Sequence, residues 1–158
     1  MATTVLSCRS STGSATALAA IGGERAASQL RAAAKQATGK ARLNLIDALA
    51  ALAEPQSAAT FRDALEDGDR EVRIAASAGL AELGLPDAVE PLVNAADAAQ
   101  GWERTQITKA CLVLAERLAA DGKKSDAKRM YERLQNTRTS DSEKHVLEAA
   151  RRGLAAIA

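Results

Sequence analysis

The most constraining feature of this chain is an internal repeat. Three stretches share one pattern and begin 31 positions apart: ALAAIGGERAASQL from residue 17, ALAALAEPQSAATF from residue 48 and GLAELGLPDAVEPL from residue 79. Similar stretches begin at Val113 and Gly153, so the later intervals are longer. A period of roughly 20–50 residues is typical of proteins in which short units stack in a row and bury each other's apolar sides. We therefore expect an elongated stack rather than a single central core.

The composition favours helices as the repeating elements. Hydrophobic residues make up 47% of the chain, and most of them are Ala and Leu, which have high helix propensities. No stretch alternates apolar and polar residues over several positions, as a half-buried strand would. Pro55 and Pro86 lie in the repeated turn, where a helix can begin without the N–H group that proline lacks. The chain is therefore predicted to be all-α, a right-handed α-α superhelix of about four to five helical hairpins.

The clearest unit spans residues 67–96. Asp67 or Asp69 is placed to cap a helix that begins near Arg70, because a carboxylate accepts hydrogen bonds from the free N–H groups of a first helical turn. Small and apolar residues then recur at helical spacing and form one stripe: Val72, Ala76, Gly79, Leu80 and Leu83. Gly84 ends this helix, and the partner helix has a stripe of its own, formed by Val89, Leu92 and Val93.

The same pattern, extended along the chain, predicts the domain organisation. Helices are expected at residues 13–21, 24–37, 40–53, 56–66, 70–83, 87–98, 102–120, 124–135 and 141–157. Residues 1–12 are expected to form a polar, mobile segment, and residues 13–158 a single repeat domain. Because the sequence ends on the apolar stripe of RRGLAAIA, we expect this domain to be a piece of a longer solenoid or of a multidomain protein.

One segment carries a resemblance to a known family. DREVRIAASAGLAELGLPDAVEPL, residues 69–92, resembles the short HEAT repeats of phycobilisome lyases and of many bacterial scaffold proteins. Their pattern is an acidic cap, Val-Arg, alanines, a leucine, a turn with glycine, and then Ala and Leu. Arg73 occupies the arginine of the pattern and Arg42 lies one period earlier, whereas Ile107 and Leu147 stand at this position in the later units. The resemblance implies a HEAT-like α-solenoid whose usual ladder of Asp and Arg side chains is incomplete.

The fourth unit departs from this pattern. LAERLAADGKKSDAKRMYERL, residues 114–134, is similar to one tetratricopeptide helix-turn-helix unit, with Gly122 at the turn and Ala127 and Tyr131 on the second helix. A HEAT unit with a lengthened helix at residues 102–121 explains the same residues. Both interpretations stay open at this point.

The sequence contains no group of residues that is typical of catalysis or of cofactor binding. His145 is the only histidine, so it provides neither a catalytic triad nor a metal site. The acidic cluster from Asp63 to Asp69 lacks the ligand spacing of a calcium-binding loop, and helix capping accounts for it better. Cys8 and Cys111 are far apart, and Cys111 falls in an apolar segment, where we expect a buried thiol. We predict a protein with no enzymatic activity, no metal and no cofactor.

Charge and hydropathy limit the expected partners and location. The net charge is +1, but residues 46–122 carry −8, between +5 for residues 1–45 and +4 for residues 123–158. An acidic middle makes nucleic acid an unfavourable partner, because surfaces that bind DNA are basic. No apolar run approaches the roughly 18 residues of a membrane span, and two isolated cysteines favour a reducing, cytoplasmic location. The segment from Met1 to Gly23 contains no acid, which leaves a plastid or periplasmic location open.

We expect the concave face of the superhelix to bind another protein, or another domain of the same chain. Cations recur where the inner helices begin, and Trp and Arg are the residues that most often dominate binding energy. The candidate contact residues are Arg42, Arg70, Arg73, Trp102, Arg104 and Lys109. Acidic residues among these cations leave a second interpretation open, in which the row forms ion pairs within the protein.

The resemblance also implies two alternative functions. A bilin-lyase-like subunit would need a pocket for a tetrapyrrole. A DNA-binding HEAT solenoid would need a basic concave face with aromatic side chains for stacking. The apolar ends of the stack further allow copies of the chain to associate.

Overall fold

The computed structural model describes residues 23–158, which form helices joined by short turns, with no strand among them. In chain order the helices are α2 (Glu24–Gln36), α3 (Gly39–Leu52), α4 (Ala58–Ala64), α5 (Arg70–Glu82), α6 (Val89–Ala98), α7 (Gly101–Ala120), α8 (Lys124–Thr137) and α9 (Lys144–Ile157). The 3-10 turns η1 (Pro55–Ser57), η2 (Pro86–Ala88) and η3 (Asp141–Glu143) precede α4, α6 and α9. The predicted all-α solenoid is confirmed.

The helix boundaries agree with the predicted ones to within a few residues. The helices expected at 56–66 and 87–98 begin with the 3-10 turns η1 and η2, whose first residues are Pro55 and Pro86. A proline fits this first turn because its N–H group would have no intrahelical partner there. The helix predicted at 13–21 lies outside the described residues.

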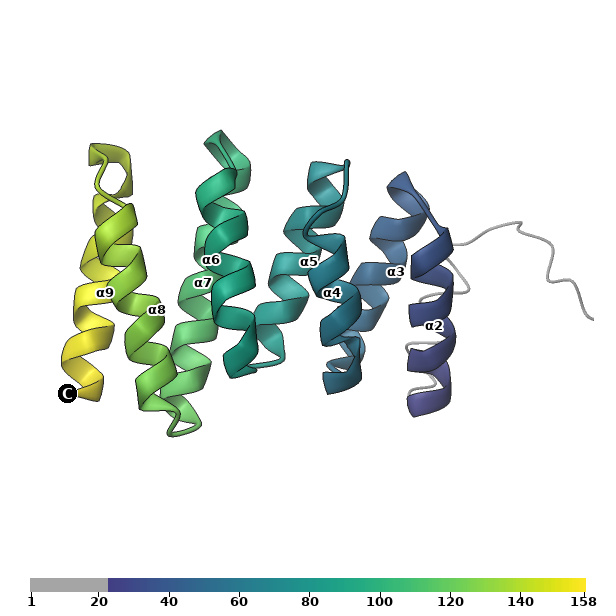
Figure 1. The fold of residues 1–158 in the computed structure, drawn as a ribbon, viewed down its shortest axis with the longest axis horizontal. Coiled ribbons are helices and arrows are strands. Elements are labelled where there is room, and N and C mark those ends of the chain that lie inside the picture. Colours follow the sequence, from purple (N-terminus) through teal and green to yellow (C-terminus); the bar gives the residue numbers. More distant parts are fainter. Residues whose placement is uncertain (1–22) are drawn as a thin grey trace, which may run out of the picture.

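The helices form two layers (Figure 1). Helices α3, α5, α7 and α9 make up one layer, and α2, α4, α6 and α8 make up the other. In the first layer α3 packs extensively on α5 and α5 on α7, whereas α2 and α4, and α4 and α6, barely touch. From α3 to α7 the helices of the first layer are therefore packed more closely than those of the second. We call the first layer the inner layer and the second the outer layer.

The turns between inner and outer helices repeat the same backbone geometry. Ala53, after α3, has a φ of 50°, and Gly84, one repeat later, has a φ of 62°. This left-handed conformation ends a helix and redirects the chain, and glycine adopts it without the steric cost that a Cβ atom brings. The equivalence of Ala53 and Gly84 shows that the repeat determines the turn even where the sequence provides no glycine.

The start of α5 is capped as predicted. The Asp69 carboxylate accepts a hydrogen bond from the backbone N–H of Glu71, at 2.9 Å. The Asp67 carboxylate accepts one from the backbone N–H of Asp69, at 2.7 Å. Both acids thus satisfy N–H groups that a helix leaves free at its first turn.

The core lies between the two layers and consists mainly of Ala and Leu side chains. Of the predicted stripe on α5, Val72, Ala76, Gly79 and Leu80 are buried and Leu83 is partly buried. The predicted stripe on α6, Val89, Leu92 and Val93, is also buried. Gly79 allows close packing, because a Cβ atom there would lie 2.7 Å from the ring of Phe61 on α4. Gly153 on α9 faces the ring of Tyr131 on α8 in the same way.

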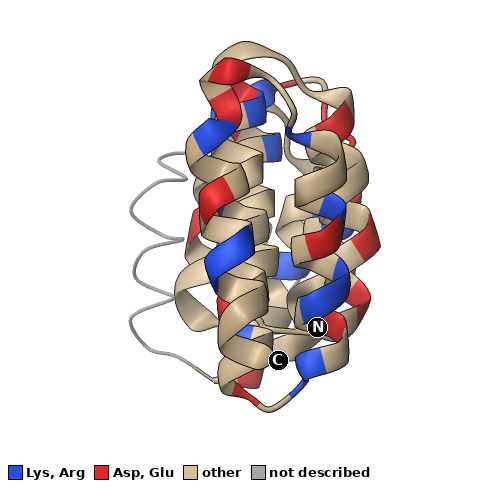
Figure 2. Cartoon of the chain, turned by 90° about the vertical axis from the view of Figure 1, so that its left-hand side faces the viewer, with Lys and Arg blue, Asp and Glu red and all other residues tan. Residues whose placement is uncertain are grey.

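Charged residues cover the outside of the last unit. Viewed from the C-terminal end of the stack, basic and acidic residues are interspersed along α8 and α9, and both signs gather at the loops of one end (Figure 2). The mixture of signs along these helices does not favour a polyanionic partner.

Candidate functional site

Three of the predicted contact residues form a row of arginines along one edge of the stack. Arg42, Arg73 and Arg104 are each the fourth residue of an inner helix and lie 31 positions apart. The row follows the edge at which the outer helices end and the inner helices begin (Figure 1). Arg104 continues the arginine spacing into a third unit, whereas the sequence pattern aligns Ile107 with Arg73. Ile107 is buried in the core. The arginine of this unit is therefore Arg104, so the ladder of Asp and Arg side chains contains one arginine more than the sequence pattern predicted.

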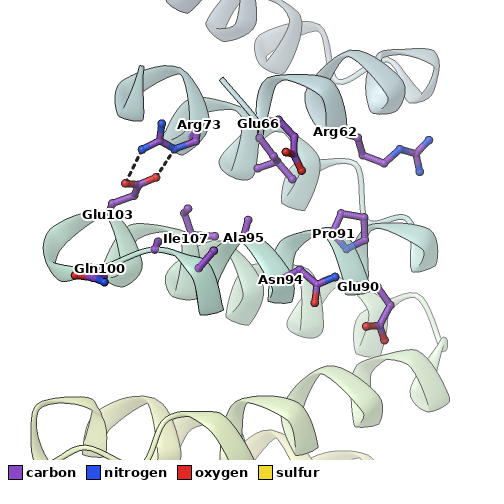
Figure 3. Close-up of a pocket in the computed structure, with 13 residues that line it drawn as sticks. Arg62, Glu66, Arg73, Glu90, Pro91, Asn94, Ala95, Gln100, Glu103 and Ile107 are labelled. Atoms are coloured by element: carbon purple, nitrogen blue, oxygen red, sulfur yellow. Dashed lines mark hydrogen bonds and ion pairs between the residues drawn. The ribbon is translucent and has the colours of Figure 1, made fainter. Parts of the chain in front are cut away.

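Arg73 forms the most regular of these contacts. Its Nε and Nη2 donate to the two carboxylate oxygens of Glu103 at 2.6 and 2.8 Å (Figure 3). Its Nη1 donates to the main-chain carbonyl of Asp67 at 2.6 Å. These hydrogen bonds lower the pKa of Glu103 below its ordinary value and raise the pKa of Arg73. The paired geometry joins the start of α5 to the start of α7.

Arg42 and Arg104 form equivalent ion pairs in their own units, and we call each such contact between adjacent repeats a joint. Arg42 contacts the carboxylates of Asp63 and Asp67 at 2.7 and 2.8 Å. Arg104 donates from Nε to Glu143 at 2.7 Å, and its other nitrogens reach the main-chain carbonyls of Ala96 and Thr137, both at 3.2 Å. The guanidinium groups of all three arginines are therefore engaged within the protein, as in the second interpretation of the row.

A fourth arginine, which the sequence analysis did not single out, lies inside the protein. Arg138 is 0% exposed and follows α8 directly. Its Nη1 donates to Asp97 at 2.5 Å and its Nε to Thr108 at 3.1 Å, while its Nε also lies 3.7 Å from the Glu143 carboxylate. Arg138 thus links α6, α7 and the connection before α9. Its place in the polar sequence NTRTSD, between two helices, is typical of an exposed loop, and its separation from Arg104 by about one repeat is the only signal that relates it to the row.

The other three predicted contact residues are exposed. Trp102 is 53% exposed and is the single large hydrophobic residue on the surface of residues 23–158. The Arg70 guanidinium lies over its ring, 5.8 Å from the ring centroid, which is within the range of a cation–π contact. Lys109 is two helical turns further along α7, on the same side of the helix.

These exposed residues border a groove of the inner layer between α5 and α7, which we call the α5–α7 groove. It has a volume of about 250 Å³. Its lining residues are Ile74, Ser77, Ala78, Ala81, Glu82, Gln106, Lys109, Ala110 and Val113. Arg70 and Trp102 lie at the end where both helices begin, and an ion pair between Glu82 and Arg117 crosses near the other end. The groove floor consists of small side chains, which leaves room for side chains of a partner.

The described part of the chain contains further titratable residues outside these contacts. Within residues 23–158, no group of three or more His, Cys, Asp or Glu side chains is arranged to hold a metal ion. Cys111 is buried in α7 as predicted, and burial raises the pKa of its thiol to about 12, so it is protonated at neutral pH. Cys8 lies outside the described residues. None of the helices in the described part is both long and apolar enough to cross a membrane.

Comparison with known proteins identifies the repeat. A family model of HEAT repeats matches residues 32–112, from α2 into α7. No curated protein matches the sequence. The matched range ends before residues 114–134, so the tetratricopeptide-like interpretation of that unit stays a prediction, as does the phycobilisome-lyase subtype.

Proposed function

Because this chain belongs to the HEAT-repeat family, we propose that it is a non-catalytic scaffold whose inner layer binds a segment of another protein or of another domain of its own chain. HEAT repeats typically serve as scaffolds for protein interactions and are generally not catalytic. We place the partner against the inner layer because of the residues in and beside the α5–α7 groove.

The observation that carries the proposal is the exposed Trp102 beneath the Arg70 guanidinium. A large apolar ring in water is unfavourable, and Trp and Arg together are the side chains most often found at the centre of protein interfaces. The two residues come from neighbouring helices, so a partner that contacts both spans the joint between two repeats. Lys109, further along the groove, supplies a cation that forms no ion pair within residues 23–158 and can meet an acidic side chain of the partner.

Arg42, Arg73 and Arg104 support this surface in a different way. Their contacts with acids of neighbouring elements fix the spacing of α3, α5, α7 and η3, and hence the width of the grooves between inner helices. We propose that they position the binding surface, while Arg70, Trp102 and Lys109 touch the partner. Reversing the charge of Arg73 would place a carboxylate against Glu103, so a loss of binding in that variant would not separate contact from folding.

Neither alternative function gains support from the inner layer. The inner helices α3 and α5 carry the acidic residues Asp47, Glu71 and Glu82, and Glu82 lines the same groove as Lys109, which does not favour a DNA backbone. Nothing about the α5–α7 groove is specific for a tetrapyrrole, and its volume of about 250 Å³ is small for such a ligand.

A photocrosslinking experiment tests the proposal. A photoreactive phenylalanine analogue at position 102 is expected to give one dominant protein adduct in cells of the source organism, and Lys109→Glu is expected to reduce it several-fold. The same analogue at Lys128, an exposed residue of outer helix α8, is the matched control. Equal adducts from both positions, or an adduct unaffected by Lys109→Glu and Arg70→Glu, would contradict the proposal.

A further inference from the structure

The outer layer contains a larger groove, between α4 and α6, that the proposed function does not use. This α4–α6 groove has a volume of about 900 Å³ (Figure 3). Leu65, Pro91, Ala95, Ala98 and Ile107 provide its apolar lining, and the Arg73–Glu103 pair closes one end. It exists because α4 and α6 barely touch, while the inner helices beneath them pack closely.

The charges of this groove are unbalanced once the ion pairs are taken into account. Its two cations are already engaged: Arg73 with Glu103, and Arg62 with Asp87 at 2.6 Å. Glu66, in the turn after α4, and Glu90, on α6, also line the groove; both are exposed, and neither forms an ion pair within residues 23–158. The two free carboxylates come from opposite sides of the groove, since one follows the end of α4 and the other lies in the first turn of α6 (Figure 3). An apolar floor between two free anions is complementary to an apolar stripe between cations.

The neighbouring groove of the outer layer shows that this charge is not a property of the architecture alone. The space between α2 and α4 has a comparable volume, about 730 Å³. Among the described residues of its lining, Arg31 is paired with Glu24, Lys35 forms no ion pair, and the one acid, Asp63, is bound to Arg42. Two grooves formed by the same repeat therefore differ in sign. The acidic character of the α4–α6 groove comes from Glu66 and Glu90 and would attract a different partner.

From this geometry we propose that the α4–α6 groove binds an amphipathic helix of a partner protein that carries Lys or Arg on both flanks of a short apolar stripe. A helix whose apolar side chains recur every three or four residues presents them on one face, and such a face fits an open groove between two helices. Its apolar side chains would lie over Ala95 and Ile107, and its cations would point toward Glu66 and Glu90. The groove is open to solvent along its length and is bounded by helices rather than enclosed, which suits a polypeptide segment. This site lies on the opposite layer from the α5–α7 groove and does not depend on it.

Two model peptides test this inference with the whole chain. Both are helical, about 18 residues or five turns long, with the same Leu and Ala stripe. The polar positions are all Lys in one and all Glu in the other. Fluorescence anisotropy near physiological salt is expected to give binding of the Lys peptide at least about tenfold tighter than of the Glu peptide, because each exposed ion pair contributes modestly and two act together.

Matched variants then locate the site. Glu66→Lys with Glu90→Lys is expected to remove the preference for the Lys peptide. Glu116→Lys with Glu148→Lys changes the net charge equally at exposed positions away from the groove, and is expected to keep the preference. Ala98→Arg, which places a long side chain in the groove at an exposed position, is expected to weaken the Lys peptide at least about tenfold. Circular dichroism checks that each variant keeps its helices.

Three results would overturn the inference: equal binding of both peptides, equal losses in the two double variants, or no effect of Ala98→Arg. Equal binding of both peptides would show that charge complementarity plays no part. Equal losses in the two double variants would mean that the peptide responds only to the net charge of the protein. No effect of Ala98→Arg would mean that the peptide binds outside the groove. Trp102→Ala and Lys109→Glu are expected to leave peptide binding unchanged, so a failure here is distinguishable from a failure of the inner-layer proposal.

Discussion

The repeats from α3 to α6 and the helices from α7 to α9 use the same architecture with different packing. In the first region the outer helices are short, with 7 residues in α4 and 10 in α6, and they leave open grooves between them. In the second region α7 has 20 residues and α8 and α9 have 14 each, and α8 packs on α6, α7 and α9. The outer helices of the first region thus leave open grooves, whereas the helices of the second region pack closely on their neighbours.

The joints between repeats differ correspondingly. Arg42 and Arg73 form their ion pairs at a partly exposed edge. At the joint of α7 and α9, Arg104 forms a similar pair, and the wholly buried Arg138 adds a second one behind it. An arginine that is removed from water must keep its acidic partners, because an unpaired buried charge is strongly unfavourable. We therefore expect the regular repeats to tolerate changes at these ion pairs better than the C-terminal unit does.

The largest expected effect is at Arg138. Arg138→Ala should lower the free energy of unfolding by about 3–5 kcal/mol, because it removes a wholly buried side chain together with its ion pair and leaves the partly buried Asp97 carboxylate with only the more distant Arg133. Urea denaturation followed by circular dichroism measures the change. The double variant Arg138→Met with Asp97→Ala should be considerably more stable than Arg138→Ala, because it removes both charges of the pair and fills the space of the arginine with an apolar side chain. A loss no greater than that of Arg73→Ala would contradict the contrast between the two joints.

Core packing should matter next, and equally in both regions. Leu80→Ala in α5 should cost about 2–5 kcal/mol by leaving a cavity, and so should Leu118→Ala in α7, since both side chains are fully buried. Arg62→Ala, at an exposed ion pair, should stay within about 0.5 kcal/mol. Similar losses at Leu80 and Arg62 would mean that the buried face of the repeat has been misidentified.

Acid should weaken the joints through their carboxylates. The Arg73 hydrogen bonds hold the pKa of Glu103 below its ordinary 4.5. The folded state therefore gains stability above about pH 4.5, and that gain is lost as pH falls through the lowered pKa. Glu103→Gln should make the free energy of unfolding less dependent on pH in this acidic range. Glu143→Gln should act in the same direction, because Arg104 holds the pKa of Glu143 low as well.

Urea titrations at neutral pH and at about pH 3.5 measure this dependence. Glu116→Gln, at an exposed carboxylate without an ion pair among the described residues, serves as the control. If Glu103→Gln and Glu116→Gln have the same slope as the unmodified chain below pH 4.5, the pairing with Arg73 makes no contribution to stability.

The smallest expected effect is a gain. Ala53→Gly should raise the free energy of unfolding by about 0.5–1 kcal/mol, because Ala53 has the left-handed conformation that glycine adopts without strain. The greater freedom of glycine in the unfolded chain offsets part of this gain. Gly84→Ala, at the equivalent turn one repeat later, should lower the stability by a similar amount. Thermal unfolding of both variants checks whether the two turns are interchangeable.

The sequence was sufficient to predict the helices, the turns and the buried stripes, because these follow from spacing within one unit. Val72, Ala76 and Leu80 lie on one side of α5 wherever the helix is placed. The Asp69 cap is likewise local. The match to HEAT repeats is consistent with this, since residues 32–112 contain the most regular units.

The ion pairs could not be predicted in the same way. The acids that bind Arg42, Arg73 and Arg104 come from different places in their units, such as the end of α4, the start of α7 and η3. Which acid faces which arginine depends on how adjacent units are rotated in the stack. The net charge of the α4–α6 groove could not be predicted from the sequence either, because it depends on which of several nearby charged side chains are already paired.

The burial of Cys111 provides a way to follow motion in the C-terminal unit. Its protonated, enclosed thiol cannot react with iodoacetamide until α7 separates from its neighbours. In a Cys8→Ser background, the alkylation rate therefore reports how often this part of the stack opens, and comparison with global unfolding would reveal whether the repeats separate one at a time or together.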